Sequence, residues 1–409
     1  MRVVVVGAGV AGLSSAVYLR RDGHQVTVLD PLPPAGGASF GNAGLISPSA
    51  HLPQALPGVL RQVPRWLLDP LGPLAIRPRA APQALPWLLR WIAASRETRV
   101  RQIAQTLHDL HRDSFECWTE LLGPVRIEAL FRRQGQMHAW EGGAPAKADL
   151  ASALRERFGT RTRVLDGAEM RDLFPGLSPS VTRGLMMPDN GHVISPAKAV
   201  AALGEVLQIE GGTVLAQRVM KLIPTEGGGW LVMANTANHR ADAVLVSAGV
   251  WSTGMLKALG LRLPVQAERG YHVSLPDPSV TLPMPISIRI RGFAVTPMEE
   301  GLRCAGTVEI ARPDDPLDER RAQKLLTHAQ ALFPGLQHGP ARLWMGSRPS
   351  TPDSVPVIGP VARRPGLFLC TGHGHFGMTA GPPSGRLLAR LMRVNDPAGD
   401  PRYGLGRFG

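Results

Sequence analysis

The chain has 409 residues, 44% of them hydrophobic and 19% charged, so it is a globular protein, not a disordered one, and is long enough for two domains. Its formal net charge of +13 would suit a nucleic-acid partner. However, the basic residues are almost all arginine, are scattered along the chain, and form neither a long charge run nor a stripe with aromatic residues. We therefore expect an arginine-rich surface and no nucleic-acid partner.

The N-terminal segment has the pattern of a dinucleotide-binding fold. Residues 3–6 form a buried valine strand, 12–22 a helix with one apolar side, and 25–29 a second strand. The run Gly7-Ala8-Gly9-Val10-Ala11-Gly12 joins the first strand to the helix, and Asp30 ends the second strand. Because the glycines stand between a strand and a helix, they predict a bound nucleotide and not an incidental turn.

Each part of this motif has a physical role. Gly7 permits the tight turn, Gly9 lets a pyrophosphate approach the backbone, and Gly12 lets the helix pack closely on the strand. The free N–H groups and the positive dipole end of the helix attract the phosphates. Asp30 would accept hydrogen bonds from the ribose hydroxyls and would repel a 2′-phosphate, which disfavours NADP.

The next segment is rich in turn-forming residues and prolines. Residues 31–48 predict an ordered, turn-rich connection. Between residues 51 and 101, prolines recur among Leu, Trp and Arg, as in 64–68 and 86–91, which predicts short amphipathic helices broken by proline. Two interpretations stay open: these helices pack into a second domain, or they present a surface to a membrane or a partner.

The remaining elements indicate that the chain returns to the nucleotide fold. We predict helices at 98–122, 196–211 and 316–332, a strand at 213–223, and an apolar strand at 241–249 that enters a glycine turn. A nicotinamide-dependent enzyme of this length normally completes its nucleotide domain in sequence. This chain leaves that domain after the second strand and returns near residue 196, which favours FAD.

We therefore predict an α/β protein with two domains. One is a discontinuous, Rossmann-like FAD-binding domain of the ββα type, and the other is an inserted α+β substrate domain built on an antiparallel sheet. Residues 1–50, 190–255 and 341–409 are assigned to the FAD-binding domain. Residues 51–189 and 256–340 are assigned to the substrate domain.

The cysteines and the apolar runs bear on localisation. Cys117, Cys304 and Cys370 are too far apart in sequence for a metal motif or a disulfide framework, which indicates a reducing compartment. The valine run stops at Gly7, so no signal peptide is expected, and no apolar run reaches the roughly 18 residues that span a bilayer. We expect a cytoplasmic protein, with peripheral contact with the inner face of the cytoplasmic membrane as the alternative.

Three further stretches carry a resemblance to a known family. They are residues 37–48, residues 346–353 leading to 356–359, and residues 372–379. Together with the glycine motif, they resemble the FAD-dependent D-amino-acid dehydrogenases and oxidases and the related glycine, sarcosine and hydroxyproline oxidoreductases. The resemblance covers essentially the whole chain. Residues 374–379 look most like the hydroxyproline-oxidising branch.

The resemblance implies roles for three candidate catalytic residues. Arg348 matches the arginine that holds the substrate carboxylate, for which a planar guanidinium is well suited; the alternative is a structural ion pair. Tyr271 matches a tyrosine of the substrate pocket, and the alternative is a core aromatic. His375 stands beside the flavin, where it acts either in catalysis or only through the geometry of its glycine-flanked backbone.

The resemblance also implies a cofactor-binding set. The helix that begins at residue 377 would point its N–H groups at the pyrimidine edge of the flavin and stabilise the negative charge of the reduced form. The expected FAD-binding residues are Gly7, Gly9, Val10, Ala11, Gly12, Asp30, Ser39, Asn42, Ala43, Gly44, Leu45, Val219, Ala248, Gly249, Trp251, Gly372, Gly374, Phe376, Gly377, Met378 and Thr379. Relatives with a covalent flavin carry a cysteine where this chain has Gly346, so non-covalent FAD is expected. No metal is expected.

The implied reaction is oxidation of the Cα–N bond of a D-amino or cyclic imino acid, with hydroxy-D-proline and D-proline-like substrates favoured. Hydride would pass from Cα to flavin N5, and the electrons would continue to a quinone or a partner protein. Two alternatives stay open: an oxidase of glycine, sarcosine or D-amino acids that uses oxygen, and a flavin-binding subunit that is active only in a hetero-oligomer.

Overall fold

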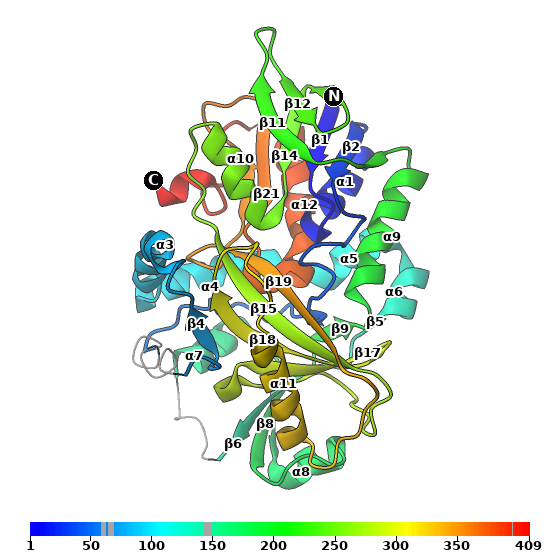
Figure 1. The fold of residues 1–409 in the computed structure, drawn as a ribbon, viewed down its shortest axis with the longest axis vertical. Coiled ribbons are helices and arrows are strands. Elements are labelled where there is room, and N and C mark those ends of the chain that lie inside the picture. The colour runs from blue at the N-terminus through cyan, green and yellow to red at the C-terminus, as the bar shows by residue number, and fades with distance from the viewer. Residues whose placement is uncertain (59–62, 64–68, 143–148, 395) are drawn as a thin grey trace.

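The computed structural model describes residues 1–58, 63, 69–142, 149–394 and 396–409. The proline-broken segment expected at 64–68 lies outside the described residues. Figure 1 shows two layers of structure along the long axis: a sheet flanked by helices in the upper part, and a larger, strongly twisted sheet in the lower part. Among the described helices, none combines the length and the apolar character that a membrane crossing requires.

The upper sheet contains the nucleotide motif. Its strands, in spatial order, are β10 (Thr213–Ala216), β2 (Gln25–Asp30), β1 (Arg2–Val6), β14 (Ala243–Val246), β21 (Leu367–Thr371) and β20 (Val357–Pro360). All neighbours are parallel except β20, which pairs antiparallel with β21. This order brings together strands from both ends and the middle of the sequence, as the discontinuous nucleotide fold predicts.

Both faces of β1 are buried, which explains its all-valine sequence. Val3 and Val5 belong to a core shared with helices α1 (Val10–Arg21), α9 (Pro196–Ile209) and α12 (Gly377–Arg393). Val4 and Val6 belong to a core on the opposite face. That face is covered by β11 (Val219–Pro224), β12 (Trp230–Ala234), β13 (Asn238–Ala241) and α10 (Ser252–Ala258).

Three more helices pack on the helical side of the upper sheet. They are α4 (Glu97–His111), α5 (Ser114–Leu122) and α6 (Pro124–Leu130). Leu107, Phe115 and Trp118 share one core with Val3 and Val5. The predicted domain boundary at residue 51 therefore lies between segments that share a core. The single helix predicted at 98–122 is two helices, with a break at residues 112–113.

The lower sheet has nine strands in the described part of the chain and is mostly antiparallel, as predicted. Its order is β19 (Arg342–Ser350), β15 (Gln266–Leu275), β18 (Gly301–Ile310), β17 (Phe293–Met298), β16 (Ile286–Ile288), β6 (Gln136–Glu141), β8 (Val181–Met187) and β7 (Arg163–Asp166), with β4 (Leu74–Ile76) beside β18. The two parallel pairs are β16 with β6 and β18 with β4.

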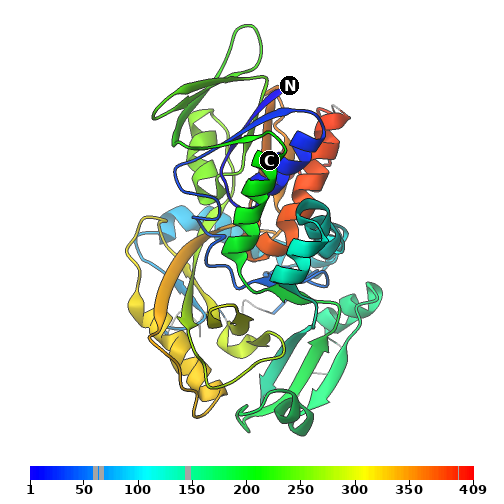
Figure 2. The same ribbon diagram turned by 90° about the vertical axis from the view of Figure 1, so that its right-hand side faces the viewer.

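Helices cover the lower sheet from different sides. Helix α11 (Glu319–Leu332) packs on β15 and β18, and α8 (Gly167–Leu173) packs on β8. Helix α3 (Ala81–Ala94) packs against Ile310 of β18 through Ala84 and Trp87, and α7 (Leu150–Arg157) packs near α4. Figure 2 shows the β6–β8 arm beside the part of the sheet that carries α11.

A short third sheet connects the two layers. It consists of β3 (Leu45–Ile46), β9 (Gly191–Val193) and β5 (Phe131–Arg132) in the order β3-β9-β5. Strand β3 lies in the predicted 37–48 stretch, so this sheet fixes that stretch at the junction of the upper and lower layers.

The crossing of α1 and α12 gives a test of the fold. An added Cβ at Gly385 of α12 would lie 2.7 Å from Ser15 N and 2.8 Å from the carbonyl carbon of Ser14, and backbone atoms cannot turn away. We expect Gly385→Ala to lower the free energy of unfolding by about 1–3 kcal/mol in denaturant titrations. In the control Gly254→Ala, in α10, the new methyl group meets open space, so the change is neutral or stabilises by up to about 1 kcal/mol. Equal effects of the two substitutions would contradict the tight crossing.

Candidate active site

The glycine turn after β1 has the shape that a nucleotide requires. Gly7 has a φ of +115°, and an added Cβ would lie 2.5 Å from Ser247 O. An added Cβ at Gly12 would lie 2.0 Å from Gly7 O, so helix and strand pack too closely for a side chain. At Gly9 an added Cβ would meet only Ser39 Oγ, at 3.4 Å. Gly9 thus leaves room for a ligand that approaches the backbone, whereas Gly7 and Gly12 are required by the fold itself.

The start of α1 fits a pyrophosphate. Its first turn contains no acidic residue, and the helix has no capping side chain on its N-cap residue, Gly9. Ser39 Oγ accepts a hydrogen bond of 3.1 Å from Val10 N. Asp30 accepts 2.8 Å hydrogen bonds from Ala8 N and Leu32 N, which holds its carboxylate beside the turn. The residues present therefore fit a dinucleotide, with Asp30 placed for a ribose.

The start of α12 lies next to the start of α1. An added Cβ at Gly377 would be 3.7 Å from Val10 Cγ1. Thr379 Oγ1 accepts a hydrogen bond from Ser47 N and donates one to Leu45 O, at 3.1 and 3.3 Å. These bonds tie the 37–48 stretch to the first turn of α12. Two helix N-termini and this loop therefore meet in one place, as a flavin nucleotide with two separate anionic regions would require.

The other predicted cofactor residues come from neighbouring turns. Ala248 lies against Gly7, and the short 3-10 turn that follows begins at Gly249 and ends at Trp251, which is 52% exposed. Val219 follows β10, whose last residue pairs with Asp30. Gly44, Gly372 and Gly374 have φ values of +75°, +86° and +49°. Asn42 Oδ1 accepts a 2.8 Å hydrogen bond from Gly44 N, Ala43 lies between these two residues, and Phe376 and Met378 flank Gly377.

One face of the β15–β19 ribbon is directed at this cofactor region. The two strands pair without interruption, with Glu268 opposite Arg348, Gly270 opposite Gly346 and His272 opposite Trp344. Because side chains alternate along a strand, all of these residues share one face. His272 lies within hydrogen-bonding distance of Gly41 O through Nδ1, at 3.0 Å, so this face meets the 37–48 stretch. Burial lowers the pKa of His272 to about 3, so the ring is neutral.

Arg348 lies in the middle of that face and is held by the backbone. Its guanidinium donates a 3.0 Å hydrogen bond to Thr307 O. An added Cβ at Gly270 would be 2.1 Å from Arg348 Cζ, so the guanidinium rests on the bare backbone of Gly270. Within the described residues Arg348 forms no ion pair. Burial lowers its pKa, against the opposing effect of the Glu268 charge. The structural ion pair that the sequence left open is therefore not present here.

A β-bulge places the Thr307 carbonyl. The pairing of β15 with β18 shifts register between Arg269 and Tyr271, opposite Glu309 and Gly306. Thr307 lies inside this bulge with a φ of +56°, an unusual conformation for a β-branched residue. Thr307 N donates a 3.1 Å hydrogen bond to Gly292 O. Local strain of this kind collects at functional sites, where the surrounding structure enforces it.

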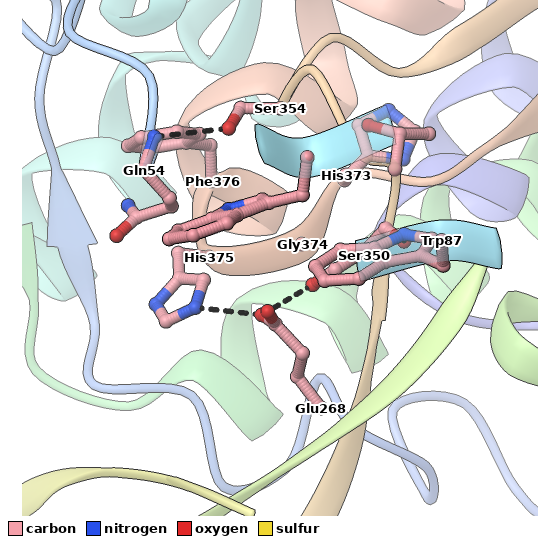
Figure 3. Close-up of a pocket in the computed structure, with 11 residues that line it drawn as sticks. Gln54, Trp87, Glu268, Ser350, Ser354, His373, Gly374, His375 and Phe376 are labelled. Atoms are coloured by element: carbon pink, nitrogen blue, oxygen red, sulfur yellow. Dashed lines mark hydrogen bonds and ion pairs between the residues drawn. The ribbon is translucent and has the colours of Figure 1, made fainter. Parts of the chain in front are cut away.

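Figure 3 shows a second polar group, centred on Glu268, whose cross-strand neighbour is Arg348. Glu268 Oε2 accepts a 2.6 Å hydrogen bond from Ser350 Oγ and lies 3.0 Å from His375 Nε2. Burial disfavours the charge of Glu268, but the hydrogen bonds from His375 and Ser350, together with the positive charges of His375 and Arg348, outweigh it. As a result, the pKa of Glu268 lies below its ordinary value. The pocket is also lined by Trp87, Trp91 and Phe376.

Tyr271 does not join this group, and its predicted catalytic position is corrected. It lies on the opposite face of β15, in the core under α11, and is only 1% exposed. Its hydroxyl donates a 2.7 Å hydrogen bond to Glu309 Oε2. Burial, followed by this carboxylate, raises the pKa of Tyr271 to about 12. Since strand alternation separates Tyr271 from Arg348, the geometry agrees with the core aromatic that the sequence left as its alternative.

The structure thus brings Arg348 and His375 together and adds residues that the sequence did not indicate. Glu268 and Thr307 are the most important of these. A period of two along 268–272 would have placed Glu268 on the face of Gly270, but only the register of β15 against β19 joins it to Arg348. His373, by contrast, lies buried with Nε2 2.9 Å from Ser384 Oγ, which is a packing role.

Comparison with known proteins identifies the family to which this chain belongs. A profile of the DAO family, described as FAD dependent oxidoreductase, matches residues 2–391. The chain is 35% identical to a D-amino-acid oxidase of Bradyrhizobium diazoefficiens, over 97% of this chain and 96% of the relative. It is 32% identical to a D-amino acid dehydrogenase of Vibrio vulnificus, with 98% of each chain covered.

Solved structures show the same fold at lower identity. A glycine oxidase from Bacillus cereus superposes with a TM-score of 0.74 at 20% identity, covering 97% of this chain and 95% of the other. An L-proline dehydrogenase from P. horikoshii also gives a TM-score of 0.74, at 17% identity, covering 100% and 97%. At these identities the likeness shows the fold alone.

The position of Tyr271 leads to a direct test. We expect Tyr271→Phe to lower the free energy of unfolding by about 1–3 kcal/mol, because Glu309 loses a hydrogen bond in a buried site. Because the hydroxyl points away from Arg348, the affinity of the site for a carboxylate ligand stays within twofold. Denaturant unfolding and ligand titration measure the two effects. A large loss of carboxylate affinity with unchanged stability would contradict the core position of Tyr271 and indicate that its hydroxyl contacts the ligand.

Proposed function

The chain belongs to the DAO family of FAD-dependent oxidoreductases, and on this premise we propose that it oxidises the Cα–N bond of a D-amino or cyclic imino acid. Its relatives are named for action on D-amino acids. Within that class we favour D-proline and hydroxy-D-proline, because residues 374–379 are similar to the hydroxyproline-oxidising branch.

The observation that carries the proposal is the state of Arg348. The residue is half-buried, its guanidinium is anchored by a carbonyl, and it has no carboxylate partner among the described residues. A guanidinium that is held in place and has no carboxylate partner can bind an anionic ligand. Its planar shape allows two parallel hydrogen bonds to a carboxylate. It lies on the sheet face that meets the cofactor region, so a bound amino acid would have its Cα between Arg348 and that region.

FAD, when bound, supplies the hydride acceptor for Cα–H. The chain contributes binding and orientation. Gly7, Gly9 and Gly12 shape the turn that would hold the pyrophosphate, Asp30 would hold the ribose, and the first turn of α12 would offer backbone N–H groups to the flavin. Arg348 holds the substrate carboxylate, while the Thr307 bulge and Gly270 hold Arg348.

We propose that the FAD is bound without a covalent link. Gly346 stands where covalent relatives carry a cysteine, and an added Cβ there would be 2.1 Å from the Trp344 ring. Cys117, Cys304 and Cys370 are all buried, and burial raises the pKa of each thiol to about 12. Each thiol is therefore protonated and inaccessible, so none can act as a nucleophile toward the flavin.

The test is anaerobic flavin reduction by a panel of D- and L-amino acids with D-proline, the hydroxyproline epimers, sarcosine and glycine. We expect bleaching by D-amino or cyclic imino acids, and release of free FAD on acid precipitation. Arg348→Ala should keep FAD and raise the KM by roughly 30-fold or more, the effect of removing a buried charged partner. Arg342→Ala, an exposed position on the same strand, is the matched control and should leave the KM unchanged. A yellow protein that no amino acid bleaches would contradict the proposal.

We further propose that the electrons pass to a quinone at a membrane surface. Leu85, Leu89 and Ile92 form an apolar face on α3 and are 54%, 58% and 40% exposed, with Arg90 exposed beside them. The opposite side of α3 reaches the candidate pocket, where Trp87 Nε1 donates a 2.9 Å hydrogen bond to Ser350 O. A helix that contacts both the pocket and the outside is a suitable route for an apolar acceptor.

The membrane contact can be measured with vesicles. We expect the holoenzyme to co-sediment with anionic phospholipid vesicles and to reduce a short-chain quinone faster than oxygen. Leu89→Glu should reduce co-sedimentation several-fold while keeping flavin reduction by substrate, because it changes only the outer face of α3. Rapid peroxide formation in air, or binding unaffected by Leu89→Glu, would favour an oxidase or a protein acceptor instead.

A further inference from the structure

The β15–β19 ribbon carries an unusual arrangement of two opposite charges. Glu268 and Arg348 are directly opposed on β15 and β19 and share the face that meets the cofactor region. Cross-strand neighbours have Cβ atoms about 4.5–5.5 Å apart, so an ion pair between them would be easy to form. Within the described residues none forms. Each charge is instead held by other groups, and each still shifts the pKa of the other.

The groups that hold Glu268 leave part of it available. Ser350 Oγ and His375 Nε2 both lie against the same oxygen, Oε2, at 2.6 and 3.0 Å. The other oxygen, Oε1, accepts no hydrogen bond from the described residues and is not among their fully enclosed polar atoms that lack a partner. Figure 3 shows the carboxylate between His375 and Ser350, at the edge of the pocket. The carboxylate is therefore fixed at one oxygen and open at the other.

Glu309 on β18 shows what a purely structural carboxylate looks like in this sheet. Its Oε1 accepts a 2.8 Å hydrogen bond from Arg77 Nε, and its Oε2 one of 2.7 Å from the Tyr271 hydroxyl. Arg269 Nη1 lies 3.3 Å from the same Oε2. Both oxygens are thus used, and two arginines neutralise the charge. Glu268 has neither feature, although it is equally buried, so packing alone does not account for it.

We propose that Glu268 is the subsite for the amino or ring-imino group of the substrate, so that Glu268 and Arg348 together bind the amino acid as a zwitterion. This inference rests on the proposed function and deepens it. An α-amino acid carries its ammonium and carboxylate on one carbon, and two neighbouring strands present the complementary charges at directly opposed positions. A cation at the end of a long side chain would lie too far from the carboxylate to match this pair.

The aromatic walls are consistent with this subsite. Trp87, Trp91 and Phe376 line the same pocket as Glu268. Aromatic faces attract a cation that has lost its water, and their bulk removes water from the Glu268 charge. His375 is a positioning residue in this scheme, because it acts on the substrate only through Oε2 of Glu268. The Ser350 hydroxyl has the same role.

The experiment compares two ligands that differ only in the amine. The holoenzyme is titrated with its best amino-acid substrate and with the same acid lacking the nitrogen; for D-proline this is cyclopentanecarboxylate. Glu268→Gln should weaken the amino acid at least tenfold, measured in the anaerobic reductive half-reaction. It should leave the amine-free carboxylate within twofold, or bind it more tightly, because a negative charge beside Arg348 is removed. Arg348→Lys should weaken both ligands.

Two further variants separate binding from stability. Glu309→Gln, the matched carboxylate on the opposite face, should lower the thermal unfolding midpoint and keep the ratio of the two affinities. Glu268→Asp keeps the charge and shortens its reach, so it should weaken the amino acid selectively, though less than the glutamine variant does. If Glu268→Gln does not retain FAD, Glu268→Asp is used for the test instead.

The failure of this inference can be distinguished from failure of the proposed function. If amino acids reduce the wild-type flavin but both Glu268 variants affect the two ligands equally, or neither ligand, the amine subsite is wrong and the amino-acid activity stands. If no amino acid reduces the wild-type flavin, the proposed function itself is wrong.

Discussion

The uninterrupted pairing of β15 with β19 is the constraint on which the rest of the site depends. Strand alternation sends Glu268 and Arg348 to the face that meets the cofactor region and sends Tyr271 to the core under α11. A slip of one residue would exchange the two faces and bury the candidate site in the wrong layer. The bulge at Thr307 lies on the neighbouring strand, so it can redirect one carbonyl to Arg348 without disturbing this register.

The upper layer, which contains the glycine turn, depends instead on the close approach of helix backbones to each other and to the turn after β1. Gly12 brings α1 onto the turn after β1, and Gly385 brings α12 onto α1. The two helix N-termini therefore open at the same place, and neither helix has an acidic residue in its first turn. This arrangement joins the two ends of the sequence into one candidate cofactor site, and the hydrogen bonds of Thr379 connect that site to the 37–48 stretch.

Local patterns in the sequence located the first elements of the nucleotide fold, but they did not predict every break between elements or the contacts between distant strands. The valine strand, the glycine turn and the helix after it were predicted within two residues, because strong periodicity and glycine spacing act over short range. The strand expected at 213–223 is instead two strands in different sheets. The position of Tyr271 and the partnership of Glu268 with Arg348 both depend on a register between residues some eighty positions apart, which no local pattern contains.

The account is tested most directly by the structure of the FAD complex with an amine-free carboxylate bound. Our account predicts the carboxylate in a two-bond contact with the Arg348 guanidinium, on the sheet face shared with Glu268 and Gly270, with the flavin ring at the first turn of α12. Arg348 would keep its hydrogen bond to Thr307 O, and Glu268 would face the position of the missing amine. A carboxylate bound elsewhere, or Arg348 turned away to pair with Glu268, would contradict it.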